Sequence, residues 1–106
     1  MTDTPLGTIG DEIILENEHV RVWSLRLEPG ERQPLHRHDL PYIVIPITEG
    51  RNEMRWPDQR VVHTDEKPGQ ALWRLPGVPH ELVNTSDFTY RNVLVELKIP
   101  TGGEPK

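Results

Sequence analysis

Two histidines one residue apart, His36 and His38, stand just before an apolar run in the segment PLHRHDLPYIVIPITEG, residues 34–50. On a regular strand such a pair points to one side, with side-chain origins about 6.6 Å apart. Two imidazoles at that spacing can converge on one ion, about 2.1 Å from each ring nitrogen. A pair alone leaves a metal site incomplete, so a third ligand is required from elsewhere in the chain.

The remaining histidines, His19, His63 and His80, are the candidates for that third ligand. His80 has the most informative setting, because it follows the rigid turn PGVP and opens the run HELVN. In that run His80 shares a face with Leu82 and Asn84, which directs it toward a protein interior. His63, in VVHTDE, and His19, in ENEHV, lie in polar surroundings, and we expect both to be solvent-exposed.

Short strands are the elements expected to position these side chains. Eleven prolines and eight glycines divide the chain into pieces too short for several ordinary helices. The apolar pattern between them has period two: in NVLVELKI, residues 92–99, the odd-numbered apolar residues share one face, and Asn92, Glu96 and Lys98 lie on the other. Pro46 within the apolar run 42–48 indicates a bend or an edge position. Strands are predicted over 19–27, 42–48, 52–56, 60–64, 70–75, 80–84 and 90–99.

Many short strands separated by Gly/Pro turns predict an all-β sandwich or barrel. At 106 residues the chain is expected to form one domain over 1–106, with a core of about 12–100 and short flexible ends. A formal net charge of −5 argues against nucleic acid as a partner.

The absence of cysteine excludes disulfides, thiolate nucleophiles and Cys-based zinc sites, so any metal must be bound by His, carboxylate or water oxygen. No apolar run approaches the length of a membrane span, and residues 1–10 lack the basic start and apolar stretch of a signal peptide. We therefore expect a cytoplasmic protein without a membrane partner.

The first histidine region resembles the first motif of the cupin family, which runs G, five residues, H-x-H, three or four residues, E, six residues, G. In GERQPLHRHDLPYIVIPITEG, Gly30, His36, His38 and Gly50 occupy the matching positions. The motif glutamate belongs at residue 42 or 43, where this chain has tyrosine and isoleucine. Asp39 is no clear substitute, because on a regular strand it faces away from His38.

The second region, GQALWRLPGVPHELVN, resembles the second cupin motif, G, five residues, P-x-G, two residues, H, three residues, N. Gly69, Gly77, His80 and Asn84 match, while leucine occupies the proline position at residue 75. The motif glycines are expected at turns that need positive φ or at close backbone approaches. The resemblance covers roughly residues 16–99, and the region around the first motif also looks like small bacterial cupins, some grouped with β-alanine degradation proteins.

This resemblance implies a double-stranded β-helix, a jelly-roll barrel in which both motifs meet near the mouth. It also implies a metal site formed by His36, His38 and His80 without a carboxylate. Three neutral imidazoles leave the charge of a divalent ion uncompensated and leave positions open for water or an anionic, chelating substrate. The expected cofactor is one divalent transition metal per chain, Fe, Zn, Ni or Cu.

Resemblance to cupins with three-histidine sites implies a metal-dependent dioxygenase of a small organic acid, thiol or diketone. This oxidoreductase activity is the leading hypothesis. The sequence identifies no catalytic residue. One alternative is a metal and small-molecule binding or accessory module without turnover. Another is a metal-dependent isomerase or decarboxylase, which requires a proton-transfer group. Small cupins commonly pair through an N-terminal strand and one sheet, so the family implies a homodimer.

Several further side chains have two interpretations each. The hydroxyl of Tyr42 could bind a metal-bound substrate or oxygen, but we favour a ring that fills the space of the missing glutamate, with its hydroxyl on a partner. Tryptophans at half-buried strand positions, here Trp23, Trp56 and Trp73, are more often core or dimer contacts than platforms for a substrate, and of the three Trp73 is the best placed to line a pocket. Arg37 and Arg74 could attract a carboxylate substrate, although arginines that flank inward strand positions usually face solvent.

Overall fold

The computed structural model describes residues 7–98, and these residues form two antiparallel sheets without a helix. No helix long and apolar enough to cross a membrane occurs in that range. Of the predicted ends, about 1–11 and 101–106, residues 1–6 and 101–106 lie outside the described residues, as do residues 99 and 100. The nine strands are β1 Glu12–Glu16, β2 Val20–Leu27, β3 Arg32–His36, β4 Tyr42–Pro46, β5 Gly50–Arg55, β6 Val61–Glu66, β7 Leu72–Arg74, β8 His80–Asn84 and β9 Tyr90–Leu97.

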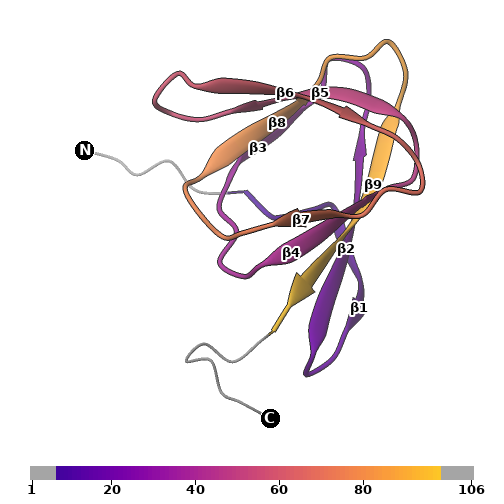
Figure 1. Ribbon diagram of the computed structural model, residues 1–106, viewed down its shortest axis with the longest axis vertical. Helices are drawn as coiled ribbons and strands as arrows, with labels where there is room; N and C mark the ends of the chain where they lie inside the picture. The colour runs from indigo at the N-terminus through magenta and orange to yellow at the C-terminus, as the bar shows by residue number, and fades with distance from the viewer. Residues whose placement is uncertain (1–6, 99–106) are drawn as a thin grey trace.

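The two sheets enclose the interior as a double-stranded β-helix (Figure 1), which confirms the predicted fold class. One sheet has the order β1-β2-β9-β4-β7 and the other the order β3-β8-β5-β6. The seven predicted strands are present with bounds shifted by a few residues, and β1 and β3 are additional strands. Pro46 ends β4 beyond the last residue that pairs with β7, where no amide donor to β7 is needed.

The two motif regions are joined through Asn84, at the end of β8. Its amide nitrogen donates to the backbone carbonyls of Leu27 and Phe88 at 2.9 and 2.8 Å, and its backbone carbonyl accepts from Gly30 N at 2.8 Å. Gly30 has a φ of 79°, which only glycine adopts without strain. This asparagine therefore holds the turn before β3 against β8, and its role is structural.

Gly50 is a close approach, because a Cβ there would overlap the ring of the buried Tyr90. Gly77 shows neither predicted property, since it has no positive φ and a Cβ there would meet open space. The motif glycines thus act for different physical reasons, and the expectation for Gly77 was wrong.

The predicted alternation of β9 is confirmed, and its polar residues Asn92 and Glu96 lie on the buried face. Asn92 and Glu96 are 3% and 2% exposed, whereas Val93 and Val95 on the other face are only half-buried. Buried polar side chains need hydrogen-bond partners, and Glu96 accepts from Trp23 Nε1 at 2.7 Å. The barrel interior is therefore partly polar, and the outer face of this sheet is apolar.

Candidate metal centre

His36 and His80 are brought together by the pairing of β3 with β8. His36 is the last residue of β3 and His80 the first of β8, and they face each other directly in the antiparallel register. Their ring centroids lie 4.6 Å apart. Two of the three predicted ligands are thus placed by backbone hydrogen bonding near the barrel mouth.

His38 reaches the same place from a loop, not from a strand. It lies two residues beyond the end of β3, so the regular-strand geometry assumed for His36 and His38 is wrong. Its ring centroid is nevertheless 5.0 Å from that of His36 and 5.4 Å from that of His80. The candidate ligand nitrogens of the three residues all lie within 4.8 Å of one another, so the predicted cluster is present.

Burial keeps this cluster neutral. Desolvation, followed by repulsion from the neighbouring imidazoles, lowers the pKa of His38 to about 3. Desolvation also lowers the pKa of His80 to about 4, with smaller contributions from His36 and Arg74, and it lowers the pKa of His36. Neutral imidazoles are the form that binds metal ions, so near neutral pH the three histidines can bind a metal without first losing a proton.

Hydrogen bonding fixes the orientation of His36. Its Nδ1 lies 2.8 Å from the carbonyl oxygen of Pro34, and a carbonyl can only accept. The proton is therefore on Nδ1, and the lone pair of Nε2 is left for a ligand. Metal-binding histidines are commonly oriented in this way.

His38 supplies the observation that tests whether a metal fits. Its Nδ1 is buried and has no hydrogen-bond partner among residues 7–98. Leaving such a nitrogen unpaired costs about 1–3 kcal/mol, which an ion or a bound ligand would offset. The donor set and this unpaired nitrogen both fit a divalent transition metal.

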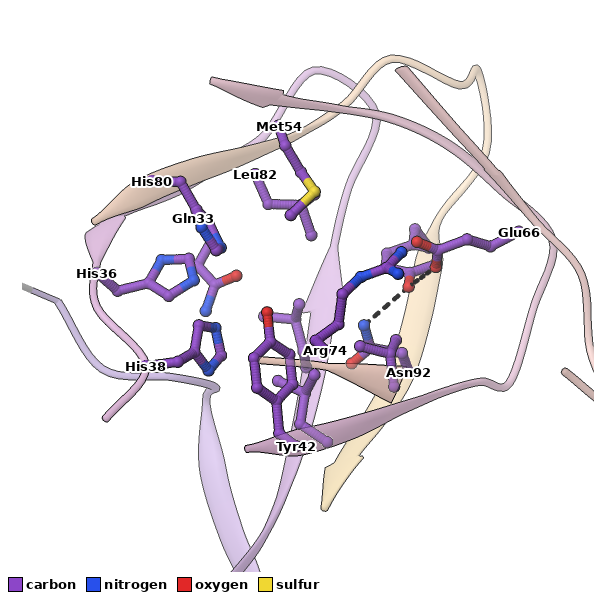
Figure 2. Close-up of a pocket in the computed structure, with 14 residues that line it drawn as sticks. Gln33, His36, His38, Tyr42, Met54, Glu66, Arg74, His80, Leu82 and Asn92 are labelled. Carbon is purple, nitrogen blue, oxygen red and sulfur yellow. Dashed lines mark hydrogen bonds between the residues drawn. The ribbon is translucent and has the colours of Figure 1, made fainter. Parts of the chain in front are cut away.

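Tyr42 stands beside the cluster where the motif glutamate was expected. Its ring stacks on the ring of His38 at 3.7 Å with an interplanar angle of 10°, as the packing interpretation requires. The expected hydrogen bond of its hydroxyl is not found in the described part of the chain, and the hydroxyl points into the cavity (Figure 2). Desolvation raises the pKa of Tyr42 to about 12, so this hydroxyl keeps its proton and can donate to a ligand.

A second set of polar residues lies across the cavity, and the sequence patterns did not predict it. The hydroxyl of Tyr90 donates to the buried carboxylate of Glu66, and Asn92 Nδ2 donates to that hydroxyl at 2.8 Å. Figure 2 shows Glu66 and Asn92 opposite the histidines. Glu66 lies at the end of β6, outside both motifs, in the acidic run TDE, which gave no signal of burial.

Some of the remaining candidate residues lie inside the barrel wall and others lie outside it. Trp73 is 52% exposed, so its assignment to a pocket was wrong, and Trp56 lies near the cluster instead, 5.7 Å from the His80 ring centroid. Arg74 lines the cavity, whereas Arg37 is exposed and pairs with Asp39 at 3.0 Å. The side chains of His19 and His63 are exposed, as predicted.

Two facing antiparallel sheets with a three-histidine cluster inside define a cupin. The chain belongs to the family of AraC-like ligand binding domains, whose model matches residues 26–99. The β-alanine degradation protein BauB of Pseudomonas aeruginosa is 34% identical to it over 85 residues, which cover 80% of this chain and 86% of that protein.

Solved structures agree with this assignment. A cupin domain from Bordetella pertussis Tohama I is 31% identical with a TM-score of 0.78, and the match covers 92% of this chain and all of that one. An RmlC-like cupin family protein with a double-stranded β-helix fold from Methanocaldococcus jannaschii has a TM-score of 0.62 at 22% identity, covering 81% of this chain and 76% of that one. This second likeness concerns the fold alone.

Proposed function

We propose that His36, His38 and His80 bind one divalent transition metal, Fe, Zn, Ni or Cu, and that the site acts on a small organic molecule. The observation that carries this proposal is the convergence of three buried, neutral imidazoles within 4.8 Å in the wall of a cavity. When bound, the metal would supply Lewis acidity and, for a redox-active ion, electron transfer to oxygen.

The leading reaction class is a dioxygenase-type oxidation of a small organic acid, thiol or diketone by molecular oxygen. The cluster contains no carboxylate, so the charge of the ion would favour an anionic ligand. The protein's own contribution is to orient that ligand and exclude water: the Tyr42 hydroxyl can donate to it, and Met54, Leu82 and Leu94 form apolar parts of the wall. The similarity to BauB, a β-alanine degradation protein, supports a small organic acid.

Two alternatives have specific support. The family description, AraC-like ligand binding domain, favours a metal-containing binding module without turnover. Glu66, a carboxylate in the same cavity, is the proton-transfer group that a metal-dependent isomerase or decarboxylase requires.

Oxygen consumption separates these three functions. Protein loaded anaerobically with Fe²⁺ is mixed with air-saturated solutions of candidate thiols, diketones, hydroxy acids and amino acids, while oxygen uptake, substrate loss and binding are measured. We expect substrate-dependent oxygen uptake that His80→Ala abolishes and that His63→Ala, at an exposed histidine, preserves. Saturable binding without consumption supports the binding module, and substrate loss without oxygen uptake supports the isomerase or decarboxylase.

We further propose that two copies pair through β1 and the outer face of the five-stranded sheet. Three consecutive residues of β1, Ile13, Ile14 and Leu15, are exposed, and an irregularity in the pairing with β2 places Ile13 opposite Trp23 and Leu15 opposite Val22, so these two side chains point to opposite sides of the strand. Figure 1 shows β1 extending past the barrel with the ends of β2 and β9. A strand with apolar side chains on both sides is best covered by a second copy, as the cupin resemblance implies. A single domain and a cytoplasmic location remain predictions.

A further inference from the structure

The cavity has a narrow inner part and a wider outer part that meet at a waist. The inner volume is about 30 Å³, room for little more than one or two water molecules, and the outer volume is about 240 Å³. A ligand must therefore sit mainly in the outer part and at the waist. The residues that line both parts are His38, Tyr42, Met54, Arg74 and His80.

Arg74 is the only permanently charged residue at this waist. It lies directly opposite Tyr42 in the register of β7 with β4, so the two side chains leave neighbouring backbone positions on one face. Because the Tyr42 ring stacks on His38, Arg74 is one side chain away from the histidine cluster. Figure 2 shows its side chain extending into the cavity, with the guanidinium directed toward the side of Glu66 and the histidines on the other side.

The guanidinium of Arg74 lacks a carboxylate partner. Arg74 takes part in none of the ion pairs found within residues 7–98, so Glu66 is not within 4.0 Å of it. Its one hydrogen bond in that range is a long contact of 3.5 Å to the carbonyl of Trp73. Arg37, outside the barrel, pairs with Asp39 at 3.0 Å instead.

The charged residues that line the outer part of the cavity also favour an anionic ligand. Among the described residues, the lining of this part includes Arg60 and Arg74 but no aspartate or glutamate. Acidic residues nevertheless outnumber basic ones 17 to 12 in the chain. Arg60 lies over the ring of Trp56 at 4.1 Å, which positions a second cation at the rim. A concave site with cations and no acids concentrates anions.

The inner end of the cavity has the opposite character. The carboxylate of Glu66 faces it, and the buried Oδ1 of Asn92 has no hydrogen-bond partner in the described part of the chain. Both groups are acceptors, so an anionic group is disfavoured there and a hydroxyl or amine is favoured. The negative charge of a ligand is thus best placed at the waist, beside Arg74.

We propose that Arg74 determines specificity by binding the carboxylate of a small organic acid that lies between it and the three-histidine cluster. This inference rests on the proposed function and names its ligand class. A guanidinium can bind a carboxylate with two parallel hydrogen bonds, a geometry that neither a neutral amide nor a lysine reproduces.

Matched acid and amide ligands test this role. Full-length Zn²⁺-loaded protein, which should not turn over, is titrated calorimetrically with glycolate, lactate, malonate and succinate and with the neutral amide of each. We expect the acids to bind more tightly than their amides. Arg74→Gln should weaken acid binding roughly 10- to 100-fold and leave amide binding unchanged, and Arg74→Lys should fall between. Arg37→Gln, which removes the same charge outside the barrel, should match wild type.

Metal content and circular dichroism of each variant show whether folding and the histidine site are intact. The proposal is overturned if no acid binds saturably at millimolar concentrations, if acids and amides bind wild type alike, or if Arg74→Gln weakens both equally. Wild-type protein that takes up no metal contradicts the proposed function instead. The same titration of metal-free protein then decides separately whether acid binding depends on Arg74.

Discussion

The two faces of β9 differ in chemistry. Its inward face carries the polar Asn92 and Glu96 beside the apolar Tyr90 and Leu94, all buried, and its outward face carries half-buried valines at 93 and 95. In most sheets with one covered face the inward residues are apolar. The polar residues mixed into this inward face fit an interior that binds a ligand, and the apolar outward face fits packing against another surface.

The interior tolerates its polar side chains because most of them are paired. Glu96 accepts from Trp23 and lies 3.5 Å from Arg21, and Glu66 accepts from Tyr90. Two buried atoms of the cavity wall are exceptions among the described residues, His38 Nδ1 and Asn92 Oδ1. Unpaired buried groups reduce stability, so these two atoms fit a site that a metal and a ligand complete. The other unpaired buried side-chain atoms of the described residues belong to Asn52 and Thr64, outside this cavity.

The largest effect is expected from removing a histidine of the interior. His80→Ala should reduce bound transition metal from near stoichiometric to near zero after metal supplementation, because two imidazoles hold an ion far more weakly than three. Elemental analysis of purified protein measures this. His63→Ala is the matched control and should bind metal as wild type does. Equal metal content in both variants would falsify the assigned ligand set.

The outer face is tested by placing a charge on it. Val95 lies between Val22 and Ile43 at the centre of the sheet, so Val95→Asp would bury an unpaired carboxylate between two copies. Such burial costs several kcal/mol, which weakens dimerisation by roughly 100-fold or more. Sedimentation should show a dimer for wild type and a monomer for the variant.

Two further observations make this experiment decisive. Val61→Asp changes an exposed valine on β6, in the other sheet, and should leave the dimer intact. Metal content of Val95→Asp should stay at the wild-type level if the two faces have separate roles. A monomeric wild-type protein at high concentration contradicts the dimer directly.

A smaller effect is expected at Gly50, the last glycine of the first motif, which packs against Tyr90 in the cavity wall. Gly50→Ala places a methyl group in steric overlap with the Tyr90 ring and should lower the free energy of unfolding by roughly 1–3 kcal/mol. Gly77→Ala meets open space at a normal φ and should cost far less. Denaturant unfolding of both variants measures the difference, and equal stabilities would contradict the close approach.

Sequence patterns predicted the fold and the histidine cluster because both depend on local spacing. Alternation located seven strands, and the cupin motifs placed His80 with His36 and His38. The residues of the cavity wall could not be predicted from local spacing. Arg74 enters the wall through the pairing of β7 with β4, two strands distant in sequence, whereas Glu66 ends β6, which pairs with its neighbour β5. The burial of a charged strand residue depends on which face the barrel closes over.

The smallest predicted effect concerns acid and the metal-free protein. Burial lowers the pKa values of His38 and His80 to about 3 and 4, below the usual value near 6.5. Between pH 6.5 and about 4 the unfolded chain therefore binds more protons at these residues than the folded chain, so acidification favours unfolding. The free energy of unfolding should fall from pH 7 to pH 5. His63→Ala should keep this slope and His80→Ala should reduce it, whereas a stability independent of pH over that range contradicts buried, neutral imidazoles.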